Sequence, residues 1–163
     1  MLTGIVIGVG RRASEAGKVA RAKAELAALS AALEGYRRQY GDYPRTTDNP
    51  TLLQSLIGKL GPTGSALNPL GRVQLEIAKF TVASPSTPDT AVDPFSNASG
   101  QLLDPWGQPY RYAYAARSTG WMNPSFVLYS IGPDGAESAT LLSGGFIDVA
   151  ADANADNVIA NRN

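Results

Sequence analysis

The 163-residue chain contains neither cysteine nor histidine. The absence of cysteine excludes disulfide bonds and thiol nucleophiles, and it removes the usual indicator of the redox compartment. The absence of histidine removes both the commonest general base and the commonest transition-metal ligand. Serine–histidine catalysis and the usual zinc chemistry are therefore excluded, and the composition favours a protein that is not an enzyme.

The chain also lacks a net charge, because 14 basic residues balance 14 acidic ones. No overall electric field therefore attracts nucleic acid or an anionic membrane, and we expect no nucleic-acid partner. Only the two ends carry an excess of one charge. Basic residues outnumber acidic ones in 1–23, and acidic residues outnumber basic ones in 134–163.

No hydrophobic run is long enough to cross a bilayer as a helix, which takes roughly 20 apolar residues. The most apolar segment is residues 2–10, and Arg11 and Arg12 follow it. A signal peptide carries its positive charges before the apolar core and ends in a cleavage site of small residues, and neither is present here. Three glycines within this segment also weaken it as a buried strand.

A long amphipathic helix is predicted over residues 13–40. Alanine, the best helix former, is abundant there, and the larger apolar residues recur at helical spacing. Gly41 provides a stop, and Pro44 prevents the helix from continuing. The predicted apolar stripe consists of Val19, Leu26, Leu29, Leu33, Tyr36 and Tyr40.

The rest of the chain predicts one short helix and a small sheet. Asn49 as N-cap and Pro50 at the first helical position indicate a helix that ends at Gly58. Residues 61–101 are rich in Pro, Ser, Thr, Asn and Gly, so we expect a long surface connection in which only 73–82 has enough apolar content for a strand or helical turn.

Three segments predict antiparallel strands: residues 109–116, where tyrosines alternate, residues 125–130 and residues 145–150. One long helix followed by antiparallel strands is typical of the α+β class. We expect the inner face of the sheet to cover the stripe of the helix.

The C-terminal stretch offers oxygen ligands at every second position, in Asp152, Asn154 and Asp156. This spacing is similar to the opening of an EF-hand calcium loop. The sixth position is Asn157 instead of glycine, and the twelfth is Asn163 instead of glutamate, so an EF-hand is not expected. A looser calcium site completed from elsewhere and a simple polar tail both remain open.

Two further motifs allow a structural and a functional interpretation. In the structural interpretation, residues 130–135, SIGPDG, form a tight turn, because Pro followed by Asp-Gly is typical of turns. In the functional interpretation, Ser130 and nearby backbone carbonyls are oxygen ligands of the calcium ion considered for the C-terminal stretch. Trp106, between a proline and a glycine, is interpreted as a structural anchor, with ligand stacking as the alternative. The carboxylates show no pairing that a glycosidase mechanism requires.

Four short segments in this order resemble the major, calcium-binding pseudopilins of type II secretion systems, within the wider type IV pilin-like group. The segments are YRRQYGDYP (36–44), DPWGQPY (104–110), LYSIGPDG (128–135) and DNVI (156–159). The resemblance covers residues 13–60 and 102–160 and leaves 61–101 unmatched.

The resemblance implies a pilin-like α+β fold, in which a long N-terminal helix packs on a small antiparallel sheet beside a variable α/β connection. Residues 1–12 would be the remaining part of a hydrophobic membrane and filament helix, and 13–163 a single domain. Within that domain, 13–40 would be the helical spine, 41–101 the variable connection and 102–163 the sheet with a calcium-loop region.

The resemblance also implies a function. Such subunits are held in the bacterial inner membrane by a single helix with the domain in the periplasm. They then assemble with copies of themselves and other pseudopilins, on inner-membrane secretion components, into a filament that drives protein export. The leader and the start of the hydrophobic helix are missing from the printed sequence, so we expect the natural one to extend upstream of Met1.

For the calcium ion, the resemblance implies the Leu128 carbonyl and Ser130 on one side and Asp156 with Asn157 on the other. Asn157 stands where the family has a carboxylate, which should weaken the affinity. The spacing to Asp156 is longer than in the family, so Asp152 or Asn154 could substitute.

Two alternative functions remain at this point. One is a type IV pilin or minor pilin in adhesion, motility or DNA uptake, although the absence of a cysteine pair disfavours pilins with a disulfide-closed loop. The other is a secreted carbohydrate-binding or hydrolytic domain that uses the tyrosine-rich strand and Trp106. Neighbouring genes would separate a secretion system from a pilus, and a glycan screen would test the second alternative.

Overall fold

The computed structural model describes residues 5–138 and 140–160, with side chains from Arg12 onward. Within these ranges the chain forms two α-helices, three short 3-10 helices and two three-stranded antiparallel sheets. The fold class is therefore α+β with one long N-terminal helix, as predicted.

Helix α1 spans Ile5–Tyr40 and forms the spine of the molecule. Gly41 ends it with a φ of 82° and donates its N–H to the Arg37 carbonyl at 2.7 Å, so the predicted stop is confirmed. The start lies further upstream than the predicted residue 13. One face of the helix is buried at the predicted spacing, through Ala22, Leu26, Leu29, Ala32, Leu33 and Tyr36.

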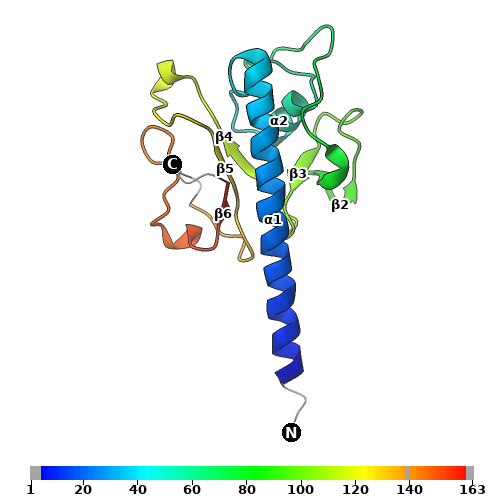
Figure 1. Ribbon diagram of the computed structural model, residues 1–163, viewed down its shortest axis with the longest axis vertical. Helices are drawn as coiled ribbons and strands as arrows, with labels where there is room; N and C mark the ends of the chain where they lie inside the picture. Colours follow the sequence, from blue (N-terminus) through cyan, green and yellow to red (C-terminus); the bar gives the residue numbers. More distant parts are fainter. Residues whose placement is uncertain (1–4, 139, 161–163) are drawn as a thin grey trace.

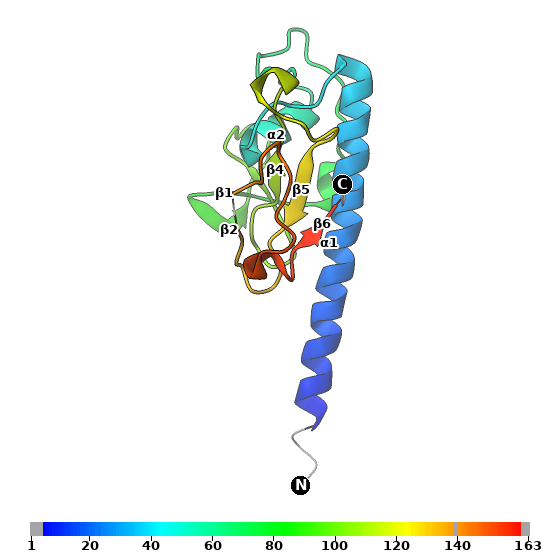
Figure 2. The same ribbon diagram turned by 90° about the vertical axis from the view of Figure 1, so that its left-hand side faces the viewer.

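The body of the protein packs along one side of the C-terminal part of α1, and the N-terminal part of the helix projects beyond it (Figures 1 and 2). Trp106 donates its indole N–H to Oε2 of Glu15 on α1 at 2.8 Å. The Trp106 ring also packs against the main core. Trp106 is thus a structural anchor that ties the turn before β4 to the helix.

Helix α2 spans Asn49–Leu56, and its N-cap is Asp48, one residue before the predicted Asn49. The Asp48 carboxylate accepts the N–H of Thr51 at 2.9 Å, which satisfies an otherwise free helix donor. The Asn49 side chain is buried instead, and its amide bonds the backbone of Leu102 and the carbonyl of Tyr110. Asn49 therefore joins α2 to both sheets.

The segment predicted as a surface connection contains a sheet of its own. Strands β1 (Thr81–Ser84), β2 (Thr87–Ala91) and β3 (Gln101–Leu103) pair antiparallel in the order β2-β1-β3. A 3-10 helix, Ile77–Lys79, precedes them. The prediction of a helical turn or strand within 73–82 is confirmed by this 3-10 helix and by the start of β1. The rest of the sheet was not predicted, and β2 is exposed along its whole length, so its sequence carries no apolar alternation.

The second sheet consists of β4 (Arg111–Ala113), β5 (Val127–Ser130) and β6 (Val158–Ile159), in the order β4-β5-β6. The first two lie inside the predicted strands 109–116 and 125–130. The predicted strand 145–150 is wrong, because that segment turns instead. Gly144 and Gly145 both have positive φ, and a Cβ at Gly145 would lie 2.3 Å from the ring of Trp121. The third strand is β6, beside α1 near the C-terminus (Figure 2).

Among the described residues, no helix is both long enough and apolar enough to cross a membrane.

Candidate cation site

The turn after β5 meets the C-terminal loop at Gly132. This glycine has a φ of 75°, and a Cβ on it would lie 2.6 Å from the Asp156 carbonyl oxygen, so only glycine fits there. The N–H of Asp134 donates to Oδ2 of Asp156 at 3.3 Å. The structure thus brings the GPDG turn and the residues around Asp156 together, although more than 20 residues separate them in the chain.

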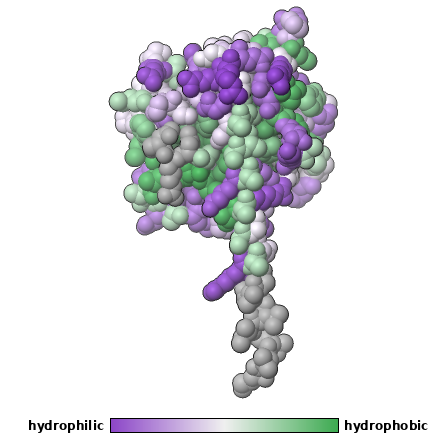
Figure 3. Space-filling model, in the orientation of Figure 1, coloured by the Kyte–Doolittle hydropathy of each residue, from purple (hydrophilic) through white to green (hydrophobic). Residues whose placement is uncertain are grey.

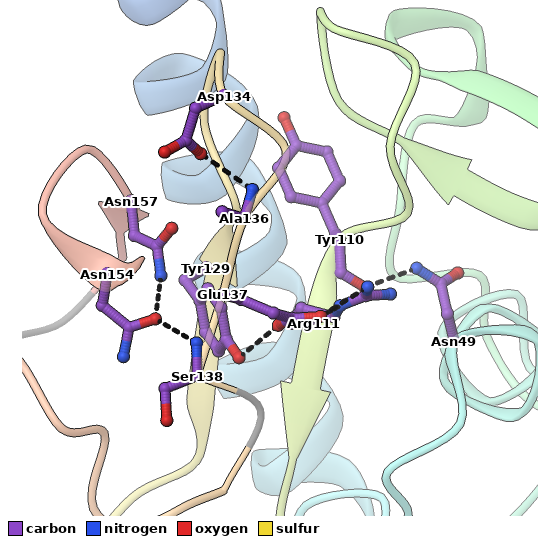
Figure 4. Close-up of polar contacts among 10 residues, drawn as sticks. All are labelled: Asn49, Tyr110, Arg111, Tyr129, Asp134, Ala136, Glu137, Ser138, Asn154 and Asn157. Carbon is purple, nitrogen blue, oxygen red and sulfur yellow. Dashed lines mark hydrogen bonds and ion pairs between the residues drawn. The ribbon is translucent and has the colours of Figure 1, made fainter. Parts of the chain in front are cut away.

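Asn154 organises the C-terminal loop from a buried position at the end of the 3-10 helix Asp152–Asn154. Its Oδ1 accepts the N–H of Ser138 at 2.8 Å and an amide N–H of Asn157 at 3.0 Å (Figure 4). Its own amide donates to the Asp148 carbonyl at 2.7 Å. These bonds hold the Asn157 side chain in place beside the turn.

Glu137 and Ser138, which lead into the contact with Asn154, are fixed to the sheet of β4 and β5. Glu137 accepts a hydrogen bond from the Tyr129 hydroxyl at 2.8 Å and pairs with Arg111 at 2.6 Å (Figure 4). Burial, together with the hydrogen bond to Glu137, raises the pKa of Tyr129 well above its usual value. Strands β4 and β5 therefore position Ser138, and through it Asn154.

Two oxygen atoms at this junction are buried without a hydrogen-bond partner: Oδ1 of Asp156 and Oδ1 of Asn157. A buried, unsatisfied polar atom costs about 1–3 kcal/mol, so such atoms are rare in native proteins. They belong to adjacent residues and are of the type that calcium prefers. Asp156 and Asn157 also line a hollow of about 380 Å³ with Val19 and Lys23 of α1.

Three predicted donors are not available in the same way. The hydroxyl of the fully buried Ser130 donates to Oδ2 of Asp104 and accepts the N–H of Gly132. The Leu128 carbonyl accepts the N–H of Ala160 at 3.0 Å. Asp152 is exposed, whereas the two buried oxygens without partners belong to Asp156 and Asn157, and Asn154 holds the latter.

Asp104, which the sequence analysis named only as the first residue of the DPWGQPY segment and not as a site residue, accepts the hydrogen bond from the Ser130 hydroxyl. It is only 3% exposed, and its Oδ1 accepts the N–H groups of Trp106 and Gln108, each at 2.9 Å. The Asp-Pro-Trp-Gly turn motif was the available signal, because aspartate commonly bonds the backbone two residues further on. Asp104 thus closes the turn and fixes the Ser130 hydroxyl.

Over the described ranges, no group of three or more Asp, Glu, His or Cys side chains lies close enough to hold a metal ion. Any cation at the junction would therefore take most of its ligands from amide, backbone and water oxygens.

No family model matches the chain, and no curated protein or solved structure is similar enough to count as a match.

Proposed function

We propose that the protein is a structural subunit of a pilin-like filament, namely the major pseudopilin of a bacterial type II secretion system. In this proposal the pilin-like fold comprises α1 as the spine, and residues 1–12 belong to the hydrophobic part of the helix. The domain lies in the periplasm at the inner membrane. Its partners are further copies of the chain, other pseudopilins and inner-membrane secretion components.

The observation that carries the proposal is the second face of α1. The body covers one face, and the opposite face is exposed and consists largely of alanine and glycine. Figure 3 shows this face as a pale column over the helix, bordered by hydrophilic residues. Its exposed members include Ala13, Ala16, Gly17, Ala20, Ala24, Ala27 and Ala31.

Small residues at a spacing of three and four let the backbones of two helices approach closely. An exposed helix that only needed to be soluble would carry charges on this face. The projecting N-terminal part of α1 extends away from the body, where a neighbouring helix can reach it (Figure 1). Both features suit a helix that packs against copies of itself in the core of a filament.

The proposal includes one calcium ion at the junction of the GPDG turn and the C-terminal loop. Asp156 and Asn157 would hold it through the two buried oxygens that lack partners. When bound, the ion supplies positive charge to oxygens that are otherwise unsatisfied, and so it stabilises the contact between the turn and β6.

The described rings on which the carbohydrate-binding alternative depends do not form an exposed aromatic platform. Tyr110 and Tyr112 are 1% and 4% exposed, and the hydroxyl of Tyr112 donates to the Pro44 carbonyl. The indole N–H of Trp106 is bonded to Glu15. These rings belong to the core and to the contact with α1.

The role of this alanine face in filament assembly can be tested by introducing a large side chain on it. The chain is expressed from its natural gene together with type II secretion assembly components, and filaments sheared from the cells are quantified by electron microscopy and immunoblot (the filament assay). We expect Ala24→Trp to abolish filaments without lowering the melting temperature, because residue 24 is exposed.

Ser118→Trp is the matched control, since Ser118 is equally exposed but lies in the 3-10 helix Arg117–Thr119, away from α1. It should leave the filament yield unchanged. Normal filaments with Ala24→Trp would contradict the proposed role of this face.

A further inference from the structure

A polar hollow of about 410 Å³ lies beside the C-terminal end of α1. It is lined by Gly35, Arg38 and Gln39 of the helix and by Arg72 and Gln74 of the segment that follows α2. The Gln74 amide donates to Oε1 of Gln39 at 2.6 Å and so joins the two sides. A Cβ on Gly35 would lie 2.6 Å from Oε1 of Gln74, so the glycine leaves room for this amide.

The two arginines of the hollow have no acidic partner among the described residues. Arg38 and Arg72 are both exposed, and no described carboxylate lies within ion-pair distance of either. By contrast, Arg21, Arg45 and Arg111 each pair with a carboxylate. Two guanidinium groups at one hollow offer the planar donors that bind a carboxylate best.

Asp152 is the complementary feature. Its sequence position suggests a metal ligand, but the structure leaves it exposed at the start of the 3-10 helix Asp152–Asn154. Within the described chain, no hydrogen bond or ion pair uses its carboxylate. The side chain is therefore available to a partner molecule.

The two features lie on opposite sides of α1 and at different heights along it. In Figure 1, the segment that follows α2 lies to the right of the upper part of α1, and the red-orange 3-10 helix lies to the left and lower. When two parallel copies lie side by side with an axial offset, the 3-10 helix Asp152–Asn154 at the lower left of one copy meets the hollow at the upper right of its neighbour.

We propose that Asp152 of one copy binds the Arg38–Arg72 hollow of the next copy. This inference rests on the proposed function, because it requires copies with parallel α1 helices. The pair sets the axial offset between neighbours, while the alanine face supplies the close packing. An exposed ion pair is screened by salt, so the contact weakens as ionic strength rises.

Charge reversal in the filament assay tests this contact. Asp152→Arg places three like charges together, and we expect it to lower the filament yield by roughly tenfold or more. Arg38→Glu combined with Arg72→Glu should cause a similar loss. The triple variant, which exchanges the charges, should restore filaments.

Asp89→Arg is the matched control, because Asp89 is also exposed and free of ion pairs but lies on edge strand β2. It should leave the yield unchanged, and all variants should keep the wild-type melting temperature. Filaments that are indifferent to Asp152→Arg would overturn this contact while leaving the proposed function intact. Absence of filaments from the unmodified chain would instead overturn both.

Discussion

At the scale of single residues, the atoms that matter most for the candidate site are the two buried oxygens of Asp156 and Asn157. Each lacks a hydrogen-bond partner, although the neighbouring Asn154 side chain makes three hydrogen bonds. Sequence reasoning identified Asp156 from the spacing of oxygen-bearing side chains, and Asn157 only from the resemblance to the pseudopilins. It could not show that Ser130 and Leu128 are engaged elsewhere, because Asp104 and Ala160 reach them only through the tertiary fold.

Removal of calcium should therefore lower the stability of the purified domain. A tightly bound ion contributes roughly 3–4 kcal/mol when present well above its dissociation constant, which corresponds to a shift of about 6–16 °C in melting temperature. Thermal unfolding by circular dichroism, with calcium and with a chelator, measures the shift.

Asp156→Asn should abolish the calcium response, because it removes the only carboxylate at the two unsatisfied positions. Asp152→Asn serves as the control and should respond like the wild type, since Asp152 is exposed. If calcium shifts the melting temperature of the wild type by less than about a degree, the ion has no structural role in the domain.

At the scale of elements, hydrogen bonds from tyrosines to carboxylates join the parts of the fold. Tyr110 donates to Oε2 of the buried Glu25 on α1 at 2.6 Å. Tyr114, just after β4, donates to Asp42 after the helix end at 2.7 Å. These bonds fix the sheet to the helix at two heights, and they require the phenols to be protonated.

The folded protein should consequently lose stability in alkali. Burial, with a hydrogen bond to Asp42, raises the pKa of Tyr114 to about 12, and burial raises the pKa of Tyr110 further. A phenol with a raised folded pKa stabilises the fold fully below its unfolded pKa of about 10, and this contribution is lost as the pH rises above that value.

Melting temperatures should thus stay level from about pH 7 to 9 and fall above about pH 10. Ultraviolet titration of tyrosinate in the folded state should show several phenols that do not ionise until the protein unfolds. Ionisation of all seven tyrosines near pH 10 with the fold intact would contradict this explanation.

The helix stripe and the strands β4 and β5 were predictable because their apolar residues follow the period of the element that they form. Strands β2 and β3 were not, because β2 is entirely exposed and β3 depends on the buried amide of Asn49, whereas β1 begins within the predicted apolar segment 73–82. The predicted strand at 145–150 failed for a related reason. Gly145 lies in a turn against the Trp121 ring, and Ile147 packs against the core cluster that includes Val127, contacts that no local pattern reveals.

At the scale of the whole molecule, α1 has two faces of different composition and burial. The larger apolar residues, with Ala22 and Ala32, face the body, and the other face consists largely of exposed alanines (Figure 3). A type IV pilus and a secretion pseudopilus would both use such a helix, and neighbouring genes for a secretion ATPase and an outer-membrane channel would favour the pseudopilus.

The central claim is that the alanine face of α1 contacts α1 of a neighbouring copy inside a filament. The chain has no cysteine, so a single introduced thiol reports one position without background. A disulfide forms only where two Cα atoms come within about 7 Å, or where the backbone can move to allow it.

The most direct measurement is cross-linking between filament subunits that carry Ala20→Cys in some copies and Ala27→Cys in others, with Ser118→Cys as the exposed control. We expect dimers linked through α1 in intact filaments and none through residue 118. Efficient linkage through residue 118, with no product along the alanine face, would contradict the account.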